Sequence, residues 1–522
     1  MNASLVRIAA IVRADFWIRF RRVSTVIVFL LLSAFAYVWV PAPSTGRALV
    51  QINGHRALNT SGAIGLGTAS VGMIFIGLFG YYVISNTIRR DLTTRCGLVA
   101  ASTPMRSWEY LVGKFCGNLA FLVTFLGGFM LSSMGMLAVR GEGPFQPLVF
   151  IEQYLLLTPA AIVFVSAVAV LFESIPLLAG KFGDVVYFFF WMAVFGLVVA
   201  KETTHGSLNW MRCLDFTGFG FMIEQMQQTL HTDSVAIGAS PFDPTKTPID
   251  FTGLTLTRGW ILPRIISILA PLLLLPLAGL FFHRFDPART GTASEKTSRN
   301  WIGKLQSLFK PISRRVVAGA SRCGRAGSLG GAIWMDAFLT FTLFPLALVA
   351  LVGCTIATLA APLEMALPAV FATLAIVIAD VATRDDRAGT VASLRAIPRL
   401  RENYVWWKLG SVLLLSLLFC AAALLRTLPR GPFAVGALLG GMFFVATAAT
   451  ALGIVSSNPK TFIVGFLSFW YVVVNDRGAH PLWDFAGFYQ RATTTTVAIY
   501  VGLGMLALVL ARVSYRARLT RS

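Results

Sequence analysis

Residues 89–118 read RRDLTTRCGLVAASTPMRSWEYLVGKFCGN, and residues 384–410 read RDDRAGTVASLRAIPRLRENYVWWKLG. Both stretches are polar and basic, and each joins two long apolar runs. Five residues of the first return 294 positions later: Arg90, Asp91, Pro104, Tyr110 and Lys114 recur as Arg384, Asp385, Pro398, Tyr404 and Lys408. That many identities at equivalent places favour an internal duplication.

The two stretches also share turn and helix signals. Gly97 and Gly389 each follow the apolar run closely and permit a sharp turn. Residues 98–103 and 390–397 then have helical potential, and the proline near the end of each disfavours helix in the residue before it. We therefore predict a short helix between the two spans of each half.

The remainder of the chain is strongly apolar, with 56% hydrophobic and only 13% charged residues among 522. A soluble chain of this length would divide into several domains, whereas membrane helices can face lipid. We predict an all-α integral membrane protein of about twelve transmembrane helices in two six-span repeats, with additional interfacial helices. The predicted spans are 24–41, 64–87, 111–138, 153–173, 184–200, 260–282, 337–360, 367–383, 404–425, 432–455, 461–475 and 494–513.

The net charge of +21 orients these spans. With the N-terminus inside, 32 of the 44 lysines and arginines lie in inner segments. The positive-inside rule therefore predicts that both termini are cytoplasmic. It also accounts for the basic composition without nucleic acid, since these cations flank helices at an anionic membrane face.

The predicted domains are an interfacial helix at 1–22, a first six-span half at 23–282, a cytoplasmic linker at 283–331 and a second half at 332–522. In the first domain, residues 4–22 repeat apolar side chains at helical spacing, with four cationic anchors at Arg7, Arg19, Arg21 and Arg22. A simple basic flank is the alternative.

Two connecting segments carry further predictions. Residues 299–310 of the linker form either a short amphipathic helix on the membrane surface or part of a disordered tether. The outer loop at 201–259 is much longer than its counterpart at 476–493, and it contains a predicted helix at 217–230. The two halves are thus related but asymmetric.

The first of the two quoted stretches resembles the region between the second and third spans of type-2 ABC exporter permeases. The shared features are Asp91, Arg95, the pair Gly97-Leu98, the corner Thr103-Pro104, and Tyr110-Leu111-Val112-Gly113-Lys114. The second copy keeps Arg387, Gly389, Pro398, Tyr404 and Lys408, and it departs from the pattern at Thr390 and Trp407.

The resemblance implies that this chain is the permease subunit of an ATP-driven exporter, and that each short inner helix is a coupling helix. Two copies of a cytoplasmic ABC ATPase subunit would then dock on these helices and supply ATP and Mg. The implied docking residues are Arg95, Gly97, Leu98, Thr103, Pro104 and Arg106 in the first copy, and Arg387, Gly389, Arg395, Pro398 and Arg399 in the second.

No phosphate-binding loop occurs in the chain, because the pairs Gly113-Lys114, Gly180-Lys181 and Gly303-Lys304 lack the following hydroxyl residue that would hold Mg. We therefore predict no enzymatic activity and no cofactor in this chain. No catalytic constellation is present, and no two histidines have the spacing of metal ligands, so we predict no metal site. Glu173, Arg264 and Asp380 are candidate polar residues at membrane depth.

Two other classes remain open. A secondary transporter of the major facilitator kind also has twelve spans in two halves, but normally lacks so long an outer loop between spans five and six. A passive membrane scaffold is the third possibility. For the exporter reading, the expected location is the bacterial inner membrane, with lipid and an exported substrate as the other partners.

Overall fold

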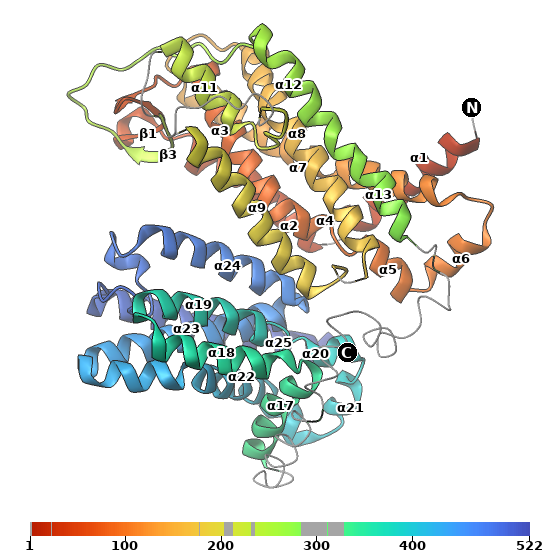
Figure 1. The fold of residues 1–522 in the computed structure, drawn as a ribbon, viewed down its shortest axis with the longest axis vertical. Helices are drawn as coiled ribbons and strands as arrows, with labels where there is room; N and C mark the ends of the chain where they lie inside the picture. Colours follow the sequence, from red (N-terminus) through yellow and green to blue (C-terminus); the bar gives the residue numbers. More distant parts are fainter. Residues whose placement is uncertain are drawn as a thin grey trace. The chain divides into compact units, whose positions relative to one another are not determined.

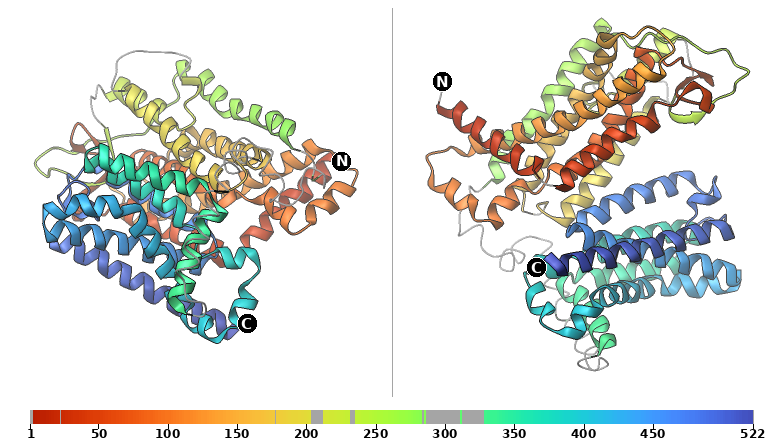
Figure 2. Two further views of the ribbon diagram at one scale, coloured as in Figure 1. Left: turned by 60° about the horizontal axis from the view of Figure 1, so that its bottom comes forward. Right: turned by 180° about the vertical axis from the view of Figure 1, so that it is seen from behind.

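The computed structural model describes residues 3–21, 23–176, 178–202, 212–230, 235–282, 285, 311 and 328–521. Most of these residues are helical (Figures 1 and 2). The chain forms two compact units, Met1–Gly291 and Thr292–Ser522, and each is described here by itself. The boundary between them falls inside the predicted linker.

The first unit is a helical bundle with a small sheet at one end. Its main helices are α1 (Ala3–Phe20), α2 (Val23–Trp39), α3 (Ser61–Phe75), α4 (Tyr81–Ile84), α5 (Thr87–Thr93), α6 (Cys96–Ser102), α7 (Ser107–Arg140), α8 (Pro147–Ser174), α9 (Lys181–Glu202), α11 (Phe219–Leu230), α12 (Arg258–Leu269) and α13 (Leu274–Phe281). Helix α7 packs against α1, α2 and α8, and α3 packs against α8. The short helices α5 and α6 lie at the end of this bundle opposite to the sheet (Figure 1).

A wide π-turn, Ile76–Gly80, interrupts the span between α3 and α4. At Gly77 the indole of Trp191, from α9, occupies the space of a side chain: a Cβ would lie 1.8 Å from Trp191 Cζ2. The hydroxyl of Tyr187 donates a hydrogen bond to the Gly77 carbonyl. Such turns leave carbonyls without their usual helical partner, and here a side chain from α9 supplies one.

A three-stranded antiparallel sheet joins the loop after α2 to the loop after α11. Its strands are β1 (Arg47–Ile52), β2 (His55–Arg56) and β3 (Val235–Pro241), in the order β2-β1-β3. Strand β1 pairs with β3 in the register Val50 to Ile237 and Ile52 to Val235. The all-α prediction omits this sheet. The predicted helix at 217–230 is confirmed as α11.

The second unit contains α17 (Leu329–Leu343), α18 (Leu346–Ala360), α19 (Leu363–Ile378), α20 (Arg384–Ala388), α21 (Val391–Arg395), α22 (Pro398–Thr427), α23 (Pro432–Ser456), α24 (Pro459–Asp476) and α25 (Thr494–Arg521). Helix α23 packs against α22, α24 and α25. Aromatic rings close one end of its core: the ring of Phe485, from the loop after α24, contacts those of Phe371, Phe444, Phe469 and Tyr500.

Every predicted span overlaps helix, but the ends of those at 24–41, 64–87 and 367–383 lie outside helix, and the span at 337–360 is broken. Within the described residues, seven helices are long and apolar enough to cross a membrane, and a bent pair raises this number to eight. Two shorter apolar helices, Phe182–Gly196 and Leu363–Ile378, accompany them. The chain is therefore a helical, multi-pass membrane protein.

The predicted span at 337–360 is divided. Its first residues belong to α17, and α18 leaves that helix at an angle of 100°. The break lies at Phe344 and Pro345, where Phe344 has a φ of −135° and a ψ of 77°. A proline disfavours helical geometry in the preceding residue, so the helix ends there. The predicted surface helix at 299–310 lies outside the described residues.

We predict that Gly77→Ala lowers the thermal stability of the protein. The added methyl group would overlap the Trp191 ring, and overpacking of this kind typically costs about 1–3 kcal/mol. Thermal unfolding in detergent would measure the change. Gly127→Ala is the matched control, because a Cβ at Gly127 in α7 meets nothing within 4 Å. Equal melting temperatures for the two variants would contradict the prediction.

Candidate functional site

The candidate site of the first unit is the segment formed by α5 and α6, which joins α4 to α7. Arg95, between the two short helices, has a φ of 60° and makes the turn that the sequence assigns to Gly97. Gly97 has a different role: a Cβ there would lie 2.6 Å from Cδ1 of Phe285. In the second unit the predicted turn is confirmed, since Gly389 has a φ of 70° and ends α20.

A buried ionic cluster anchors this segment to the bundle. Lys114, in α7, lies between two carboxylates, with its Nζ 3.0 Å from Asp15 Oδ1 and 2.6 Å from Asp91 Oδ2. Arg90 contacts Asp15 at 2.6 Å, and the hydroxyl of Tyr110 donates to Asp91 Oδ2 at 2.7 Å. The cluster therefore ties α1, α5 and α7 together at one point.

The second unit contains the same cluster. Lys408 Nζ lies 3.1 Å from Asp336 Oδ2 and 2.7 Å from Asp385 Oδ2. Arg384 contacts Asp336 at 3.2 Å, and the hydroxyl of Tyr404 donates to Asp385 Oδ2 at 3.0 Å. Each contact of the first cluster thus has a counterpart, with α17, α20 and α22 in the places of α1, α5 and α7.

Charge balance explains why these ions tolerate burial. The side chain of Lys408 is fully buried, and that of Asp336 is 4% exposed. A lone buried ion would be strongly destabilising, but each lysine here is paired with two carboxylates. Burial raises the pKa of Asp15, but Lys114, Arg19 and Arg90 together outweigh burial and lower it overall. Asp15 is therefore ionised at neutral pH.

Sequence reasoning found four members of each cluster and missed the fifth, Asp15 or Asp336. The repeat offset of 294 does not connect these two residues. The available signal was chemical: Asp15 is the only acidic residue of α1, and Asp336 the only acidic residue of α17. An isolated carboxylate in an apolar helix needs a buried cation as its partner.

The implied docking residues of the first unit are largely exposed. Leu98 and Val99 on α6 are 47% and 67% exposed, and Arg95, Thr103, Pro104 and Arg106 are exposed around them. Gly97 is buried. The opposite side of α6 packs on the bundle, because Ala100 and Ala101 lie against the core around Tyr110 and Phe285. Helix α6 thus presents an apolar face bordered by arginine.

The second segment presents a different surface. Arg387 and Gly389 are exposed, as is Ile397 at the entry to α22. Arg395 ends α21, and Pro398 and Arg399 begin α22, but the structure describes only their backbone. Val391 and Leu394 are partly buried. The second segment therefore shows less apolar surface among its described side chains than the first.

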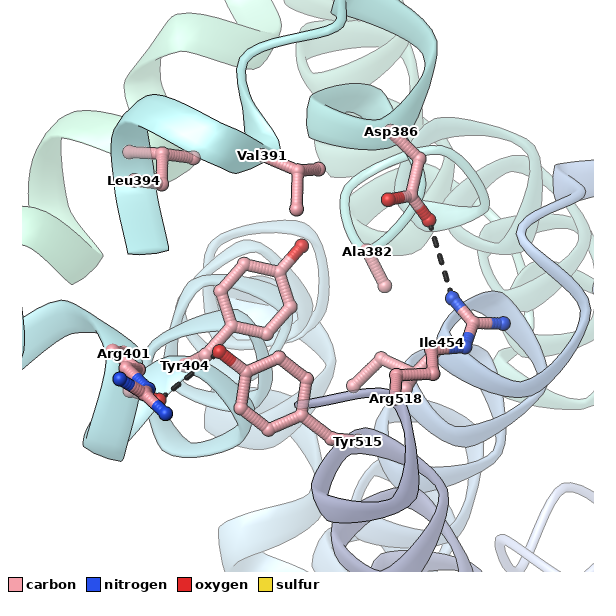
Figure 3. A pocket seen from close by; sticks show the side chains of 9 residues that line it. All are labelled: Ala382, Asp386, Val391, Leu394, Arg401, Tyr404, Ile454, Tyr515 and Arg518. Atoms are coloured by element: carbon pink, nitrogen blue, oxygen red, sulfur yellow. Dashed lines mark hydrogen bonds and ion pairs between the residues drawn. The ribbon is translucent and has the colours of Figure 1, made fainter. Parts of the chain in front are cut away.

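An aromatic stack supports each segment from the last span of its unit. The ring of Tyr404 stacks on Tyr515 of α25 at 4.9 Å, and the Tyr515 hydroxyl donates to the Arg401 carbonyl (Figure 3). A small pocket lies beside these two rings and includes Asp386 and Arg518, which form an ion pair at 3.4 Å (Figure 3). In the first unit, Tyr110 stacks at 5.3 Å on Phe282, just after α13.

The three polar candidates at membrane depth have local structural partners. Glu173 accepts hydrogen bonds from the backbone N–H groups of Thr87 and Ile88, which begin α5. Arg264 donates to the carbonyls of Leu156 and Leu157, next to Pro159 of α8, and to that of Asp215. Asp380 lies 3.7 Å from Arg384. Glu173 thus helps to fix the candidate site, whereas Arg264 joins α8 to the segment before α11.

Two of the four predicted anchors of the interfacial helix point inward, contrary to expectation. Arg19 is buried, where it donates to Asn118 at 2.7 Å, and Arg7 pairs with buried Glu109 at 3.0 Å. Arg21 is exposed, and Arg22 lies outside the described residues.

The described residues contain no group of three metal-ligating side chains.

We predict that Lys408→Met destabilises the protein by about 3–5 kcal/mol, because two buried carboxylates would lose the cation that they share. Thermal unfolding in detergent would measure the loss. His480→Gln is the control, since it removes a surface ion pair whose histidine is 74% exposed, and such pairs contribute at most about 1 kcal/mol. A Lys408→Met variant as stable as this control would refute the shared-cation account.

The chain matches no family model, no curated protein and no solved structure.

Proposed function

We propose that this chain is the permease subunit of an ATP-driven exporter of the type-2 ABC class, built from two duplicated six-span halves. The observation that carries the proposal is an exposed apolar helix, α6, that directly follows α5, which buried ions fix to α1 and α7. An exposed leucine and valine on a polar segment favour contact with another protein. The ATPase subunit is the partner that the sequence resemblance implies.

The ionic cluster suits the transmission of force. A push on α6 would reach α5, and through Asp91 it would act on Lys114 in the first turns of α7. Through Asp15 the same lysine also connects to α1. Because buried ions hold all three elements, they would move as one body rather than slide past one another. A loop serving only to join two spans would not need this connection.

Two clusters with the same contacts favour two docking sites. In this proposal both segments face the cytoplasm and each receives one ATPase copy, which agrees with the count of cations by side. The larger exposed apolar surface of α6 makes the first site the stronger one. ATP-driven closure of the two ATPase copies would then move the two halves and export the substrate.

A secondary transporter is the alternative, and the two proposals differ in measurable ways. The exporter proposal requires ATPase activity that co-purifies with the chain. The secondary transporter requires transport by this chain alone in proteoliposomes under a proton or sodium gradient. The exposed face of α6 favours the former, because a secondary transporter has no cytoplasmic subunit to bind there.

We predict that Leu98→Asp reduces the Mg-dependent ATPase activity that co-purifies with the full-length chain from its native membrane by at least tenfold. Burying a charge in an apolar contact without a partner costs well over the 1.4 kcal/mol that a tenfold loss requires. Charge reversal at Arg95 and Arg387 should weaken the association further.

Leu482→Asp is the matched control, because Leu482 is also 47% exposed but belongs to the loop after α24 and to neither segment. It should leave the co-purified activity unchanged. Equal ATPase recovery with the Leu98 and Leu482 variants would exclude docking on α6.

A further inference from the structure

Helix α1 has its polarity reversed relative to a helix on the surface of a soluble protein. Its inward face carries Asp15 and Arg19, both buried. Its outward face is mainly apolar, and Trp17 and Ile18 on it are 46% and 48% exposed. A soluble helix would bury these two side chains and expose the ions. The outward face therefore suits a medium that is apolar and lies beside water.

The outward face also carries a specific pattern of charge. Arg13 and Arg21 are exposed on it, eight residues apart, which is about 12 Å along the helix axis. A shallow hollow along this face is lined by three alanines, by Trp17 and Ile18, and by both arginines. The guanidinium of Arg21 lies 5.9 Å from the centre of the Trp17 ring. Because Asp15 is the only acidic residue of α1 and is buried, this face carries cations alone.

We propose that this face of α1 binds the headgroups of anionic phospholipids. The two guanidinium groups would contact phosphate, and the alanine-lined hollow would receive the glycerol and upper acyl region between them. Tryptophan is the side chain that favours this depth of the bilayer. The proposal fits the apolar face and the charge together, whereas a soluble anion would leave Trp17 and Ile18 in water.

The position of α1 supports a lipid occupant. The apolar helix α2 begins at Val23, two residues after Arg21, so the hollow lies where the chain passes from the surface helix toward a predicted span. The lipid face is also opposite to the cluster that holds Asp15. Lipid binding would therefore press α1 onto α7 without competing for the buried ions. This inference does not depend on an ATPase partner.

Native mass spectrometry of the full-length chain in detergent, titrated with phosphatidylglycerol or phosphatidylcholine, tests the proposal. The wild-type chain should retain phosphatidylglycerol preferentially. R13Q/R21Q should weaken its binding about 30-fold, as expected for two cations at an anionic surface. R13K/R21K should keep most of the affinity, since charge is preserved. Added salt should weaken the wild-type binding and have little effect on R13Q/R21Q.

The control is R47Q/R430Q, which removes the same charge from two exposed arginines on other segments and should leave lipid retention unchanged. Equal loss in this control, or equal binding of both lipids by the wild type, would overturn the proposal. A dimeric wild-type chain that R13Q/R21Q converts to monomers would assign the face to a second copy instead, and would also overturn it.

Discussion

The structure at the candidate site depends on one interaction, a buried lysine shared by two carboxylates. Lys114 and Lys408 each receive one carboxylate from the short helix beside them and one from a further helix, α1 or α17. Removing such ions from water costs several kcal/mol apiece, so the cluster contributes little net stability. The cluster instead fixes the position of the short helix along its neighbours, because a shift by one turn would leave an ion buried without its partner.

The same interaction explains which residues flank the lysine in each half of the sequence. Gly113, one residue before Lys114, brings α1 close to α7, since a Cβ there would lie 2.9 Å from Cγ2 of Ile11. In the second unit Trp407 replaces that glycine and donates to the Ala332 carbonyl of α17 at 2.9 Å. The close approach moves to Gly410, beside Ile333. The lysine is kept while the packing around it is rebuilt.

The features that could be predicted from the sequence are those that depend on the spacing of residues close together in the chain. The long apolar helices, the short helices after two of them, and the residues Asp91, Tyr110 and Lys114 could all be found because each pattern recurs within a few turns. Asp15 could not be paired with Lys114, because 99 residues separate them and the buried contact leaves no periodic signal. The sheet was missed for the same reason, as β1 and β3 come from loops far apart in the chain.

The differences between the two clusters indicate which features changed after the proposed duplication and which were kept. The clusters share both lysine–carboxylate contacts, one arginine–carboxylate contact and the tyrosine hydrogen bond. Arg19 adds a contact to Asp15 at 3.6 Å in the first, and Arg384 adds one to Asp380 at 3.7 Å in the second. Their supports differ more: Phe282 and Phe285 hold the first segment, whereas Tyr515 and Arg518 of α25 hold the second. If the clusters served stability alone, they would have been as free to change as these supports. A requirement to connect the short helix to its spans would keep the ions and would allow the residues around them to change. The supports, and the apolar surface that each segment exposes, would then remain free to set how strongly each segment binds its proposed partner.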